Sequence, residues 1–263
     1  MSELSRIRNP GNLRASCHSV MAAAVLALTP MPVFAEEVES SIARGGQLYD
    51  KWWKVTGTAE PKRPHPVYPA AGQYKGKGGT EWRCKECHGW DYMGKDGAYA
   101  KGKHFTGIKG IQGAAGKEPA MIVGVLKDKN HGLGDLMGEG DLRDLALFVS
   151  KGQLSMSRYI DPATKKVKGD RARGEVVFNT VCANCHGRDG TLDEDGRPLA
   201  ADSEPLGLVA SGNPWEALHK IRNGQPAERM PALRGLDLQL SLDVLSHMQT
   251  LPQEVAKGKQ AQR

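Results

Sequence analysis

Two five-residue motifs constrain this chain more than any other feature of its sequence. Each has two cysteines three positions apart, followed directly by a histidine: Cys84-Lys85-Glu86-Cys87-His88 and Cys182-Ala183-Asn184-Cys185-His186. The chain contains five cysteines in 263 residues, and four of them lie in these motifs. Two chance matches are not expected in so cysteine-poor a chain, so both motifs indicate a specific chemical role.

Covalent attachment of haem accounts for this arrangement. Two cysteines three positions apart lie on one helical turn, where both thiols reach vinyl groups on one edge of a porphyrin, and the next residue places an imidazole beneath the iron. The motifs therefore predict two covalently bound haem c groups. Their attachment sites are Cys84, Cys87, Cys182 and Cys185, and the iron ligands are His88 and His186.

Two other interpretations of a CxxC pair explain these motifs less well than haem attachment does. The pair can be a redox dithiol or half of a zinc site. A zinc ribbon would bring its two pairs close together in the sequence, whereas these motifs lie far apart. An exported dithiol is expected on a thioredoxin-like βαβ pattern, and this sequence contains no strands of that kind.

An internal duplication surrounds the motifs. Each half contains a Gly followed four positions later by an aromatic residue, then CxxCH-Gly, a helix opened by Pro, a loop with a Met, and an amphipathic helix. These landmarks are Gly45, Tyr49, Pro119 and Met137 in the first half, and Gly174, Phe178, Pro214 and Met230 in the second. The chain is therefore predicted to consist of two similar units.

Helix positions follow from local signals. Pro is favoured at the first helical position, because its missing N–H would have no helical partner there. Helices are therefore expected over 120–129 and 215–222, ending at Gly132 and Gly224. Apolar residues at i, i+3, i+4 and i+7 predict the closing helices, through 142–149 and through 242–248, where Ser241 is a possible cap.

The segments outside the duplication set the expected boundaries. The first unit is expected over 36–160, with a Pro/Gly-rich insertion at about 55–80, and the second over 171–252. A charged linker is expected over 161–170 and a disordered tail over 253–263. An insertion of this length usually has a function or is disordered.

The N-terminus has the features of a secretory signal peptide over 1–35. A basic start precedes the apolar run 20–28, which is too short to span a bilayer, and Ala35 ends a plausible cleavage site. We therefore expect export to the periplasm, with an uncleaved anchor as the alternative. The positive charges are spread along the chain, which does not suggest a nucleic-acid surface.

With these motifs in view, each half resembles a class I cytochrome c domain. The second half matches in ARGEVVFNTVCANCHG and RMPAL, and the first in CKECHG and LMGEGDLRDLALFV. The resemblance implies an all-α fold of two tandem class I cytochrome c-like helical domains, each wrapped around one haem. It also implies that the Gly and the aromatic residue of each first helix cross the last helix closely.

The resemblance also implies the second axial ligand. Such domains usually place Met opposite His, which raises the reduction potential. Met230, followed by Pro231, stands where the family places this ligand, and Met137 is its counterpart in the first half. His131 and His104 are rival ligands for the first iron, and Met93 lies too close to His88 to cross to the other side of the haem.

The predicted function is electron transfer. An iron with both axial positions filled has no place for substrate, so we assign no catalytic residues. The expected partners are a periplasmic dehydrogenase and a terminal acceptor, such as an oxidase or a small cytochrome; the chain could also be the cytochrome subunit of a dehydrogenase. We expect no nucleic-acid partner. We expect contact with a membrane only if the signal peptide is uncleaved.

The alternative is a dihaem oxidoreductase that uses one haem as its active site. A thiosulfate dehydrogenase-like enzyme would need a cysteine ligand, and the only spare cysteine is Cys17, within the predicted signal. A peroxidase-like enzyme would leave one iron open. Fold and haem content do not decide between carrier and enzyme.

Overall fold

The computed structural model describes residues 33–193, 195–200 and 202–255. Helices and loops make up these residues, and the described part of the chain contains isolated β-bridges but no strand. This confirms the all-α prediction. The predicted signal peptide and tail fall largely outside the described residues, apart from 33–35 and 253–255.

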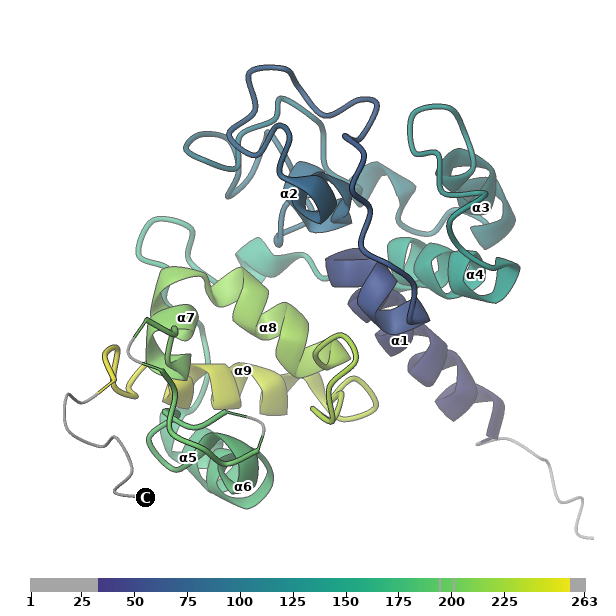
Figure 1. The fold of residues 1–263 in the computed structure, drawn as a ribbon. Coiled ribbons are helices and arrows are strands. Elements are labelled where there is room, and N and C mark those ends of the chain that lie inside the picture. Colours follow the sequence, from purple (N-terminus) through teal and green to yellow (C-terminus); the bar gives the residue numbers. More distant parts are fainter. Residues whose placement is uncertain (1–32, 194, 201, 256–263) are drawn as a thin grey trace, which may run out of the picture. The chain divides into compact units, whose positions relative to one another are not determined.

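The first half contains four α-helices (Figure 1). These are α1 (Val33–Thr56), broken at Lys51, α2 (Cys84–His88), α3 (Pro119–Leu126) and α4 (Glu139–Leu147), which continues as a π-helical turn, Phe148–Gly152. Short 3-10 turns lie at Gly78–Trp82, Gln112–Ala114 and Met156–Arg158. Pro119 opens α3 as predicted, but α3 ends at Leu126 rather than at Gly132, because the chain turns there into a loop closed by the Leu133 N–H bonding the Leu126 carbonyl.

The described residues of the second half form five α-helices. These are α5 (Arg171–Val177), followed by the π-helical turn Phe178–Cys182, then α6 (Ala183–His186), α7 (Leu206–Gly212), α8 (Pro214–Asn223) and α9 (Leu238–Met248). Pro214 opens α8 and Gly224, with φ 83°, ends it, as predicted. The cap of α9 is Asp237 and not Ser241, because the Asp237 carboxylate accepts the Gln239 N–H.

A glycine-dependent helix crossing recurs in both halves. α1 packs against α4, and α5 packs against α9. A Cβ atom on Gly45 would collide with the carbonyl oxygen of Asp144, and one on Gly174 would collide with that of Asp243. The residue before each glycine, Arg44 or Arg173, forms an ion pair with the aspartate side chain opposite. The close crossing expected from the resemblance is therefore confirmed in both halves.

A buried histidine of the second half forms hydrogen bonds with two residues of the first half. The His219 imidazole on α8 accepts a hydrogen bond from the Tyr92 hydroxyl at 2.8 Å and donates one to the Gly46 carbonyl at 2.9 Å. α8 also packs against α1. The described residues of both halves accordingly lie within one compact unit. No helix among the described residues is long and apolar enough to cross a membrane.

Candidate haem sites

The first CxxCH motif forms the single helical turn α2. Gly89, with φ 79°, ends the turn, and this left-handed conformation suits glycine because it has no Cβ. Cys84, Cys87 and His88 all line one cavity of about 580 Å³. The turn thus presents both thiols and the imidazole to the same space, as haem attachment requires.

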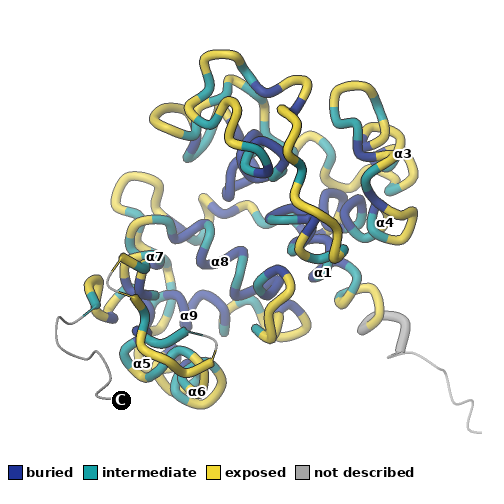
Figure 2. The backbone as a smooth tube through the Cα atoms, in the orientation of Figure 1, coloured by how far each residue is buried: buried dark blue, intermediate teal, exposed yellow. Residues whose placement is uncertain are grey.

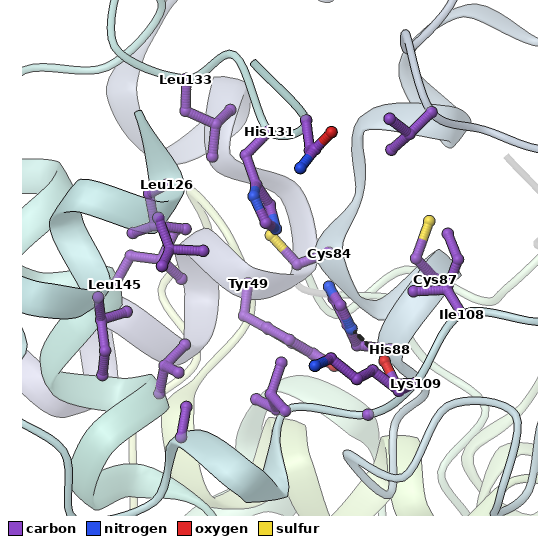
Figure 3. Close-up of a pocket in the computed structure, with 18 of the residues that line it drawn as sticks. Tyr49, Cys84, Cys87, His88, Ile108, Lys109, Leu126, His131, Leu133 and Leu145 are labelled. Carbon is purple, nitrogen blue, oxygen red and sulfur yellow. Dashed lines mark hydrogen bonds between the residues drawn. The ribbon is translucent and has the colours of Figure 1, made fainter. Parts of the chain in front are cut away.

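Apolar side chains from several elements form most of the cavity wall (Figure 3). They come from α1, from the 108–114 segment, from α3 and the loop after it, and from α4 with its π-helical turn. The principal ones are Tyr49, Ile108, Ile111, Ile122, Leu126, Leu133, Leu145 and Val149. A volume of this size and an apolar lining are typical of sites for cofactors.

The backbone orients the His88 imidazole. Its Nδ1 atom donates a hydrogen bond to the Lys109 carbonyl at 2.7 Å, which leaves Nε2 as the nitrogen that can bind a metal. Burial lowers the pKa of His88 to about 4, so the ring stays neutral at pH 7. A neutral, oriented imidazole is the form that ligates iron.

The two thiols of this motif are protonated. Burial raises the pKa of Cys84 and that of Cys87 to about 12. Redox dithiols instead need a lowered thiol pKa, because the thiolate is the reactive form. Burial of the two thiols therefore disfavours the dithiol alternative at this motif.

The rival ligands of the first iron lie in different places. His131 lines the cavity, whereas Met137 is 6% exposed and belongs to the apolar core outside the cavity lining. His104 stacks on Tyr99 and bonds Glu86 through Nδ1 at 2.9 Å, also outside the lining. Of these three, only His131 shares the cavity with His88.

The Pro-rich insertion contributes to the same cavity. His65 and Val67 line it, and the Nδ1 atom of His65 is buried without a hydrogen-bond partner. The Glu81 carboxylate holds the insertion by accepting the backbone N–H of His65 at 2.7 Å and that of Gly76. His65 looked unremarkable in the sequence, because nothing local connects it to a motif that follows much later in the chain.

The four tryptophans near the first motif are all buried. Trp82 lines the cavity, but Trp52, Trp53 and Trp90 do not. Trp52 and Trp53 pack against each other, and Trp90 packs on His219 at 4.9 Å. Trp82 is therefore the one of these four that reaches the cavity, and the other three build the surrounding core.

The second motif is more open. None of the residues of α6 is buried (Figure 2). Cys182 is half-buried and Cys185 is exposed. Gly187, with φ 71°, ends this turn just as Gly89 ends α2. Met230 is half-buried in the loop between α8 and α9. Local geometry is thus alike at the two motifs, and their enclosure differs.

Comparison with known protein families supports a haem site at the second motif. Residues 169–240 match the family described as cytochrome C oxidase, cbb3-type, subunit III. The matched segment contains Cys182, Cys185, His186 and Met230. No curated protein matches the chain. Residues 169–240 are thus similar to a cytochrome c domain, a kind of domain that binds haem c covalently and transfers electrons.

Proposed function

We propose that this chain is a periplasmic dihaem c-type cytochrome that carries electrons from a dehydrogenase to a terminal acceptor. The observation that carries the proposal is the cavity at the first motif, where both thiols and a neutral imidazole meet. The family match supports a haem at the second motif. Haem, when bound, supplies an iron that changes reversibly by one electron.

Each side chain has a distinct role in this proposal. Cys84 and Cys87 attach the first haem, and the Lys109 carbonyl holds His88 in the orientation that presents Nε2. The apolar walls exclude water from the cofactor. Cys182, Cys185, His186 and Met230 hold the second haem, as the resemblance of this half implies.

The mouth of the first cavity offers a contact area for a redox partner. Val67, Met121 and Val125 line the cavity and are 42%, 65% and 51% exposed. Exposed apolar side chains beside a cofactor favour a small, transient interface. This supports a carrier that meets a partner near the first haem.

Haem counting tests the proposal. The chain should be produced in a host that attaches haem c, and its haem measured per polypeptide from the pyridine haemochrome and by intact mass. We expect two haems in the parent protein, and one each in Cys84→Ala/Cys87→Ala and Cys182→Ala/Cys185→Ala. Cys17→Ala, in the predicted signal peptide, is the matched control and should retain two. One haem in the parent would contradict the dihaem assignment.

A further inference from the structure

We propose that His131, and not Met137, is the second axial ligand of the first haem. The inference rests on the proposed function, since it requires a haem at Cys84, Cys87 and His88. His131 and His88 lie on different elements, a loop after α3 and the α2 turn. Figure 3 shows both imidazoles projecting into the cavity.

The spacing of the two rings matches a shared metal ion. An imidazole nitrogen binds a metal at about 2.0–2.1 Å, so two rings on opposite sides of one ion have centroids about 6 Å apart. The centroids of His88 and His131 are 6.3 Å apart, and their planes differ by 18°. This separation is close to the value expected for two imidazoles that bind one iron from opposite sides.

Hydrogen bonds orient both rings in the same way. The Nδ1 atom of His88 bonds the Lys109 carbonyl at 2.7 Å, and that of His131 bonds Asp128 Oδ1 at 3.2 Å. Asp128 also accepts the backbone N–H groups of Asn130 and His131, at 2.8 and 2.9 Å. Such outer partners are typical of ligating histidines, because they hold Nδ1 and leave Nε2 for the metal.

Met137, the ligand that the resemblance implies for this iron, is packed in the apolar core instead. Its backbone N–H bonds the Leu133 carbonyl at 3.0 Å. To ligate the iron, its side chain would have to leave the core for a cavity that it does not line. His131 needs no such rearrangement.

The assignment makes the two haems unequal. His/Met ligation raises the reduction potential relative to His/His ligation. A first haem with His88 and His131 would therefore have a lower potential than a second haem with His186 and Met230. Within the chain, electrons would then move from the first haem to the second.

Near-infrared absorption of the oxidised two-haem protein tests the assignment. The methionine-sulfur-to-iron charge-transfer band is measured per haem, together with the spin state from electron paramagnetic resonance. We expect one equivalent of the band per chain, lost in Met230→Ala and retained in Met137→Leu. Two equivalents in the parent, or loss of a band in Met137→Leu, would overturn the assignment.

Substitution of His131 gives an independent measurement. In His131→Gly one haem should become high-spin and bind carbon monoxide, and added imidazole should restore the low-spin state. In His131→Met a second equivalent of the charge-transfer band should appear and the lower of the two potentials should rise. An unchanged spectrum in His131→Gly would overturn the proposal, as would a high-spin haem produced by His65→Gln instead.

Haem counting separates the two possible failures. If Cys84→Ala/Cys87→Ala leaves the haem count unchanged, the proposed function fails at the first motif. If the count falls by one but the spectra follow Met137, only the ligand assignment fails.

Discussion

The two CxxCH turns share a local structure but differ in their surroundings. Both are short helical turns ended by a glycine with positive φ, Gly89 at 79° and Gly187 at 71°. The first turn buries three of its five residues and opens into a cavity, whereas the second buries none. The motif therefore determines the position of the thiols and the imidazole, and the rest of the fold determines how far they are enclosed.

The enclosure of the first turn comes from distant segments. The insertion supplies His65 and Val67, and the loop after α3 supplies His131. The second half has a much shorter connection before its motif, where Gly174 precedes Cys182 by only eight residues. Two copies of one sequence motif can thus differ in solvent exposure and in the residues that surround them within one chain.

The largest expected effect on stability comes from the glycine at the helix crossing in each half. Gly45→Ala and Gly174→Ala should each lower the free energy of unfolding by about 3 kcal/mol, because the new methyl group would collide with a carbonyl of the crossing helix. Denaturant unfolding of the haem-loaded protein measures this. If the halves unfold as one unit, both variants shift the same transition.

Gly124→Ala is the control for these variants. Its Cβ would meet nothing within 4 Å, and it lies inside α3, so we expect a gain of about 0.5–1 kcal/mol. Two separate transitions, each shifted by only one of the crossing variants, would show instead that the halves are independent.

The next largest effect concerns the pH dependence of stability, which His219, at the contact between the two halves, should control. Burial lowers the pKa of His219 from 6.5 to about 4. Between these values the unfolded chain binds a proton that the folded chain excludes, so stability falls as the pH falls through this window. His219→Gln should therefore reduce the acid-induced loss of unfolding free energy by roughly 2–3 kcal/mol over that range.

Tyr92→Phe serves as the comparison. It removes one hydrogen bond to His219 and should cost about 1 kcal/mol, but the buried imidazole and the pH dependence remain. A pH profile that is identical in the parent and in His219→Gln would contradict the prediction.

The smallest expected effect is a difference in stabilisation between the aspartates at the two helix crossings. Asp243 is fully buried and accepts bonds from Arg173, from Gln239 at 2.8 Å and from the Asp170 N–H at 2.7 Å, whereas Asp144 is 17% exposed. Burial alone would raise the pKa of Asp243, but these hydrogen bonds lower it below its usual value. Its stabilisation is therefore present at neutral pH and is lost in acid, as the carboxylate becomes protonated.

Asp243→Asn should accordingly cost about 1–3 kcal/mol at pH 7, and Asp144→Asn about 1 kcal/mol or less. Urea unfolding at pH 7 and at pH 3 measures both costs. Equal costs at pH 7, or a cost for Asp243→Asn that does not shrink in acid, would show that the two crossings do not differ as the structure indicates.

Local signals predicted much of the helical pattern. Pro119 and Pro214 open helices as expected, and Gly224 ends one, because these residues act through their own backbone conformations. Gly132 did not end α3, because the chain leaves the helix six residues earlier, at Leu126, in a turn held by a contact between Leu133 and Leu126. Boundaries that depend on such loop contacts carry no clear mark in the sequence.

The sequence by itself predicted which residues would attach haem, because attachment depends on cysteine and histidine spacing within one helical turn. The resemblance to class I cytochrome c domains predicted that Gly45 and Gly174 lie at close helix crossings, and the structure confirms it. Only the tertiary structure decided that His131 shares a cavity with His88, that Met137 is packed in the core, and that the insertion forms part of the wall. These features depend on contacts between segments far apart in the chain, and no local spacing encodes them.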